Sequence, residues 1–64
     1  GGSVPIVLNA ANEIAVDAFL NELIPFTEII EVVQQCLEKI PFEEPITLDS
    51  IEAIDFQARK LAKA

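Results

Sequence analysis

Residues 8–20 read Leu-Asn-Ala-Ala-Asn-Glu-Ile-Ala-Val-Asp-Ala-Phe-Leu, the one long segment that combines uninterrupted helical character with small residues throughout. Alanine is the strongest helix former and occupies little space, so neighbouring helices can approach this backbone closely. We therefore predict that this segment is the central helix of the fold. Asn9, Asn12 and Glu13 interrupt its apolar pattern, and their i, i+3 and i+4 spacing places them on one side of the helix.

The length and composition of the chain limit the classes of protein to which it can belong. The 64 residues make one domain at most, 1–64, with a small core and marginal stability. Eleven acidic residues against four basic ones give a net charge of −7, which repels nucleic acid and anionic lipid. No apolar run approaches the roughly 20 residues that span a bilayer, and no signal peptide opens the chain. We therefore expect a cytoplasmic protein with neither a nucleic-acid nor a membrane partner.

The chain lacks the usual residues of covalent and metal chemistry. Cys36 is the single cysteine, and there is no histidine to activate it as a nucleophile. The carboxylates do not show the spacing of zinc, iron or calcium sites. We therefore expect Cys36 to pack in the core.

Capping residues, prolines and helical repeats predict three helices, roughly 4–21, 27–40 and 48–62, and hence an all-α fold, a small three-helix bundle. Ser3, Thr27 and Thr47 are the candidate N-caps. Asn21 can end the first helix in a left-handed conformation. We expect Gly1-Gly2 to form a loop and Pro41 to Pro45 to form a stiff connector.

Apolar residues at helical spacing predict which faces form the core. The apolar arc of the first helix is broad enough to contact more than one neighbour. The predicted rows are Val7, Ala11, Ile14 and Ala18 with Leu8, Ala11, Ala15 and Phe19 in the first helix, Ile29, Val33, Cys36 and Ile40 in the second, and Leu48, Ile51, Ile54, Ala58 and Leu61 in the third.

Three interpretations of Asn9, Asn12 and Glu13 stay open from the residues alone: a ligand-binding group, a docking surface, or a solvent-exposed face. Asparagine costs helix stability relative to alanine or glutamine, which favours docking slightly. Glu13 with Asp17 is not a convincing acid/base pair, because carboxylates at i and i+4 mostly repel each other in solvent.

A second motif, from Leu48 to Phe56, resembles the attachment site of acyl carrier proteins. In that class a serine that follows an aspartate at a helix start carries a phosphopantetheine arm, and Asp49-Ser50 match this pattern. Carrier proteins have two further helices after that serine, whereas only 14 residues follow Ser50. The alternative is that Asp49 and Ser50 are ordinary first-turn residues of a capped helix.

Three runs, Leu8 to Val16, Ala18 to Leu20 and Ile24 to Ile29, resemble the carboxy-terminal helical domain of 1-deoxy-D-xylulose 5-phosphate reductoisomerase. Leu48 to Lys60 resembles the last helix of that enzyme, so nearly the whole chain is covered. The resemblance implies a structural C-terminal domain, a fragment of a larger helical domain. Its parent would be the NADPH-dependent oxidoreductase that makes 2-C-methyl-D-erythritol 4-phosphate in non-mevalonate isoprenoid biosynthesis. The family often has glycine where this chain has Asn21-Glu22.

The resemblance also implies cofactors and partners. The parent would use NADPH and a divalent metal, Mg or Mn, but no residue here matches its dinucleotide-binding or metal-binding motifs. We therefore assign no catalytic, cofactor-binding or metal-binding residue and expect the isolated fragment to be inactive. Asn9, Asn12 and Glu13 would dock on the catalytic domain of the same polypeptide, and the parent would be a homodimer. Family members have a further helix upstream of Gly1, so the fragment would expose an apolar patch and could self-associate.

Overall fold

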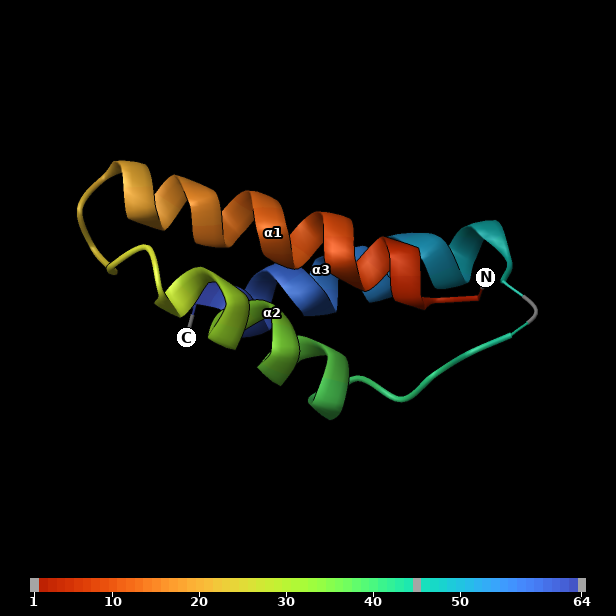
Figure 1. The fold of residues 1–64 in the computed structure, drawn as a ribbon. Helices are drawn as coiled ribbons and strands as arrows, with labels where there is room; N and C mark the ends of the chain where they lie inside the picture. Colours follow the sequence, from red (N-terminus) through yellow and green to blue (C-terminus); the bar gives the residue numbers. More distant parts are fainter. Residues whose placement is uncertain (1, 45, 64) are drawn as a thin grey trace.

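Three α-helices make up most of the computed structural model, which describes residues 2–44 and 46–63. They are α1 (Val4–Leu20), α2 (Glu28–Lys39) and α3 (Leu48–Lys63), arranged in a bundle of 36 × 17 × 17 Å. α1 and α3 run in the same direction and α2 runs opposite to them (Figure 1). α1 contacts both other helices extensively, whereas α2 and α3 contact each other little. The predicted all-α class and the central position of the first helix are confirmed.

The alanines of α1 form the middle of the core. Ala10 and Ala11 are fully buried, and Ala15 is nearly so. Their short side chains allow α2 and α3 to pack against the α1 backbone, as small residues at a helix contact do. The other buried apolar residues come from all three helices and the end of α2, namely Val7, Cys36, Ile40, Ile54 and Ala58.

The prediction that Cys36 packs in the core is confirmed. Its thiol is 1% exposed, and its Sγ donates a hydrogen bond to the carbonyl oxygen of Ala58 at 3.7 Å. Burial raises the pKa of the Cys36 thiol above its ordinary value, with Lys39 opposing the shift weakly. The thiol is therefore held in its neutral, unreactive form between α2 and α3.

Several residues of the predicted apolar rows lie at the surface. Leu8 and Phe19 are exposed on α1, because two neighbouring helices do not cover the whole of its broad apolar arc. Leu48 is 81% exposed and Ile51 is also exposed. The start of α3 extends beside α1 at the end of the bundle that α2 does not reach, so α1 is the only described helix next to this part of α3 (Figure 1).

Of the three predicted N-caps, only Thr47 is confirmed. Its Oγ1 accepts a hydrogen bond from the backbone N–H of Ser50 at 3.1 Å. The predictions for Ser3 and Thr27 were wrong, since neither side chain caps its helix. Both residues have αR backbone angles, whereas a capping side chain needs the extended conformation that is typical of the N-cap position.

Ser3 instead joins the start of α1 to the connector before α3. Its buried Oγ accepts a hydrogen bond from the backbone N–H of Glu43 at 2.9 Å. Gly2 precedes it with a φ of +62°, a left-handed conformation that suits glycine. A Cβ at Gly2 would lie 2.7 Å from the ring of Phe42 and 2.9 Å from the Glu43 carbonyl oxygen. Gly1 and Pro45, which belong to the predicted loop and connector, lie outside the described residues.

The end of α1 differs from the prediction for Asn21. Asn21 has φ −93° and ψ 13°, and the left-handed residue is Glu22, with φ 60°. The Leu23 N–H bonds to the Ala18 carbonyl at 2.9 Å and the Glu22 N–H to the Phe19 carbonyl at 3.0 Å, which is the Schellman pattern. The Asn21 amide Nδ2 donates to the Asp17 carbonyl at 2.8 Å. Asn21 thus closes the last turn while Glu22 takes the strained position.

Replacing Glu22 by glycine is expected to stabilise the chain by about 1 kcal/mol, because a left-handed conformation is costly for residues with a Cβ. Thermal unfolding followed by circular dichroism should show a midpoint higher by about 4 °C or more. The control is Glu52→Gly, the same change in the exposed interior of α3, which should destabilise by about 1 kcal/mol. A lower midpoint for both variants would contradict this account of the turn.

Candidate functional site

The structure places Asn9, Asn12 and Glu13 on the surface of α1. The Asn9 amide Nδ2 donates a hydrogen bond to Glu13 Oε2 at 3.3 Å. Among the described residues, no hydrogen-bond partner is seen for the Asn12 side chain. The structure therefore brings Asn9 and Glu13 together and leaves the Asn12 amide facing outward.

Arg59 of α3 is the residue of this site that the sequence analysis missed. Its Nη2 donates to Glu13 Oε2 at 3.3 Å, and its Nε donates to Asp55 Oδ2 at 2.9 Å. The hydrogen bond to Asp55 is the largest cause of a raised pKa of the guanidinium, and the hydrogen bond to Glu13 is the next largest. The i, i+4 spacing of Asp55 and Arg59 on one helix could have predicted the ion pair between them. No local sequence pattern predicts the contact between Arg59 and Glu13, which lie on different helices.

The network from Asn9 through Glu13 and Arg59 to Asp55 joins α1 to α3. All of its members are exposed or only half-buried, so solvent weakens the ion pairs, and their effect on stability is small. They do fix the position of the Glu13 side chain, because one of its carboxylate oxygens accepts hydrogen bonds from both the Asn9 amide and the Arg59 guanidinium. The Glu13 carboxylate thus connects α1 to α3 within the domain. Of Asn9, Asn12 and Glu13, Asn12 is the residue whose side chain makes no hydrogen bond to another described residue.

The environment of Ser50 gives no support to the carrier interpretation. Its backbone N–H donates to Thr47 Oγ1, and its own hydroxyl oxygen accepts a hydrogen bond from that same hydroxyl at 3.0 Å. Ser50 is half-buried in the first turn of α3. Both hydroxyls are thus part of the helix start, as the alternative interpretation of Asp49-Ser50 expected.

Side chains that commonly bind metals are scattered over the part of the chain that the structure describes. Within residues 2–44 and 46–63, no three side chains of His, Cys, Asp or Glu come together as a group that could hold a metal ion.

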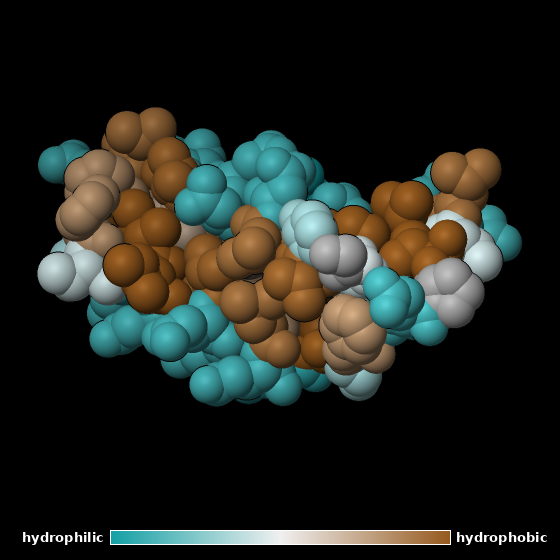
Figure 2. Space-filling model, turned by 45° about the vertical axis from the view of Figure 1, so that its right-hand side comes forward, coloured by the Kyte–Doolittle hydropathy of each residue, from teal (hydrophilic) through white to brown (hydrophobic). Residues whose placement is uncertain are grey.

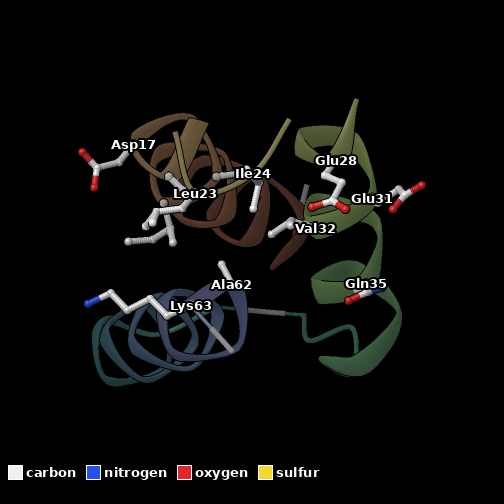
Figure 3. A pocket seen from close by; sticks show the side chains of 12 residues that line it. Asp17, Leu23, Ile24, Glu28, Glu31, Val32, Gln35, Ala62 and Lys63 are labelled. Atoms are coloured by element: carbon white, nitrogen blue, oxygen red, sulfur yellow. The ribbon is translucent and has the colours of Figure 1, made fainter. Parts of the chain in front are cut away.

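A groove of about 410 Å³ opens on the other side of the bundle, where α2 and α3 diverge beneath the second half of α1. Figure 3 shows Val32 and Glu28 reaching from α2 toward the space between the helices, with Ala62 of α3 opposite. Asp17 and Glu31 lie at the outer margins and point away. Half-buried apolar side chains and exposed charged ones both line the groove, together with the exposed Leu23. The lining residues are Ile14, Ala15, Asp17, Ala18, Leu23, Ile24, Glu28, Glu31, Val32, Gln35, Ala62 and Lys63.

Exposed apolar side chains also gather where α1 turns into α2. The rings of Phe19 and Phe26 pack edge to face with centroids 5.6 Å apart, and Leu20, Leu23 and Ile30 are exposed. Figure 2 shows apolar groups along the middle and at both ends of one face, with hydrophilic groups above and below. None of the described helices is both long and apolar enough to cross a membrane.

Comparison with known proteins gives a consistent result. The model of the family described as "DXP reductoisomerase C-terminal domain" matches residues 1–61. A 1-deoxy-D-xylulose 5-phosphate reductoisomerase of Cellvibrio japonicus is 47% identical over 62 residues, which are 97% of this chain and 16% of that protein. The enzyme of the same name from Lawsonia intracellularis is 52% identical over 59 residues, 92% of this chain and 15% of that protein.

A third relative, the 1-deoxy-D-xylulose 5-phosphate reductoisomerase of Nitrosospira multiformis, is 48% identical over 63 residues, which are 98% of this chain and 16% of that protein. The chain thus spans about 16% of the length of the curated relatives it matches. No solved structure matches it significantly.

Proposed function

The chain belongs to the DXP reductoisomerase C-terminal domain family, and from this we propose that it is a non-catalytic structural domain of a 1-deoxy-D-xylulose 5-phosphate reductoisomerase. In this proposal the domain supports the catalytic domain of the same polypeptide. The parent enzyme is an NADPH-dependent oxidoreductase that makes 2-C-methyl-D-erythritol 4-phosphate for isoprenoid synthesis and works as a homodimer in the cytoplasm. The isolated chain is inactive.

One observation carries the docking part of the proposal: two asparagines lie exposed on the central helix, beside the uncovered apolar side chains of Leu8 and Phe19. Asparagine disfavours the helix interior, so its presence there needs a compensating role. An interface that pairs the amides and covers the apolar neighbours supplies that role. Asn9, Asn12 and Glu13 are the proposed docking group, with Glu13 oriented by Arg59 and Asn12 directed toward the partner.

The parent's NADPH and its divalent metal, Mg or Mn, belong in this proposal to the rest of the polypeptide. The matched relatives are about six times longer than this chain, which leaves room for both sites elsewhere. Self-association of the isolated chain is part of the same proposal, because the exposed Phe19, Phe26 and Leu23 would remain uncovered without the rest of the enzyme.

Replacing Asn12 by leucine in the parent enzyme is expected to lower kcat/KM about fivefold, because a docking hydrogen bond is lost and the partner group is left unpaired. The same change in the 64-residue chain should leave the fold intact and raise its thermal midpoint slightly, since leucine is the better helix former. Steady-state kinetics and circular dichroism test the two halves of this expectation.

The matched control is Gln57→Leu, which exchanges an exposed amide for leucine on α3, away from the docking group. It should leave kcat/KM unchanged. Kinetics of the Asn12 variant that equal those of the wild type, or of the control variant, would rule out the docking role of this side chain.

A further inference from the structure

The groove between α2 and α3 lies apart from the proposed docking group. Its floor comes from Ile14 and Ala18 of α1, Val32 of α2 and Ala62 of α3, all of which are only half-buried in the chain. Apolar side chains at the base of a concave surface gain by being covered. The bundle therefore has a second surface, on another side of α1, that is shaped to take apolar groups.

The charges around the groove have mainly one sign. Asp17, Glu28 and Glu31 place three carboxylates at its rim, against a single ammonium from Lys63. Glu28 is half-buried and reaches toward the space between the helices (Figure 3). The whole chain carries a net charge of −7, and two of its four basic residues, Lys60 and Lys63, lie in the last turn of α3. An acidic partner would be repelled, and a basic one would be attracted and oriented.

We propose that this groove binds a basic amphipathic protein segment, whose apolar side chains contact the floor while flanking lysines or arginines reach the carboxylates of the rim. Lysine and arginine suit this arrangement because their long aliphatic stems cover apolar surface while their charged ends reach outward. Asp17 and Glu31 point outward at opposite margins of the groove, where the charged ends of such long side chains could meet them (Figure 3). A helix with leucines at i, i+3, i+4 and i+7 presents such a surface.

The proposal is tested on the 64-residue chain with two fluorescent synthetic peptides. Both carry leucines at helical spacing, flanked by lysines in one peptide and by glutamates in the other. Fluorescence anisotropy should show binding of the lysine peptide, and the glutamate peptide should bind at least about tenfold more weakly. Added salt should weaken the lysine peptide's binding, because the attraction involves exposed charges.

Two pairs of variants locate the binding site. Ala62→Leu fills the floor and should weaken binding of the lysine peptide at least about tenfold, whereas Ala53→Leu, on the exposed side of the same helix, should not change it. The double variant Glu28→Gln with Glu31→Gln should weaken it severalfold. Its control, Glu38→Gln with Glu52→Gln, removes the same charge outside the groove and should have a smaller effect.

Circular dichroism confirms that each variant is folded before its affinity is compared. If Ala62→Leu unfolds the chain, the charge variants alone decide the matter. Equal affinity for the two peptides, equal effects of a groove variant and its control, or no binding to the wild-type chain would each overturn the proposal. None of these outcomes bears on the Asn12 docking group, which is tested separately in the parent enzyme.

Discussion

Replacing Ala11 by leucine is expected to lower the free energy of unfolding by about 3 kcal/mol. Ala11 is fully buried on α1, the helix that both other helices contact. A leucine there would have to displace α2 or α3, because a close-packed core has no room for three extra carbon atoms. A domain of this size has a total stability of only about 3 to 10 kcal/mol, so the loss would be a large share of it.

Thermal unfolding followed by circular dichroism measures this effect, and the midpoint should fall by roughly 12 to 24 °C. The control is Ala53→Leu, which adds the same atoms on the exposed side of α3 and should change the stability by less than about 0.5 kcal/mol. Equal midpoints for the two variants would mean that the helices are not packed against the α1 backbone at this position.

Replacing Gly2 by alanine is expected to lower the free energy of unfolding by about 2 kcal/mol, for two reasons. The left-handed backbone, with φ +62°, is unfavourable for alanine. The new Cβ would also lie too close to the Phe42 ring, at 2.7 Å, and to the Glu43 carbonyl oxygen, at 2.9 Å. The contact between the start of α1 and the connector before α3 would open.

Chemical denaturation of the wild type and three variants separates the two causes: Gly2→Ala, Phe42→Ala and the double variant. Removal of the Phe42 ring should recover part of the loss caused by Gly2→Ala, while the backbone strain and the Glu43 contact remain. Ser3→Ala is a further check on the same joint, because it removes the hydrogen bond from the Glu43 N–H. A Gly2→Ala variant as stable as the wild type would show that the joint does not constrain the folded chain.

Much of the fold follows from local patterns. The alanines of α1 indicated close helix packing, and Ala10 and Ala11 are fully buried. The Thr47 cap and the core position of Cys36 were also predicted correctly, because each depends on residues within one or two helical turns. The predictions for Ser3 and Asn21 failed because each depended on the backbone conformation of a single residue. Ser3 is not extended, and the left-handed conformation falls on Glu22 instead of Asn21.

The candidate site was predictable only in part. Helical spacing placed Asn9, Asn12 and Glu13 on the surface of one helix, as the structure has them. It did not indicate that Glu13 would pair with Arg59, which lies 46 residues away in the sequence. That pair requires the parallel arrangement of α1 and α3, and three helices of these lengths can also be arranged in other ways.

Helix periodicity and capping act over a few residues, and they were enough to predict an all-α chain. They also predicted a central helix rich in small residues, with Asn9, Asn12 and Glu13 together on one side of it. Tertiary structure alone decided the link from Glu13 to Arg59, the close approach of Phe42 to Gly2 and the groove lined by Val32 and Ala62. Each of these joins segments that are far apart in the sequence. Their proximity results from how the helices share α1 as a common surface, which depends on packing across the whole bundle rather than on any local pattern.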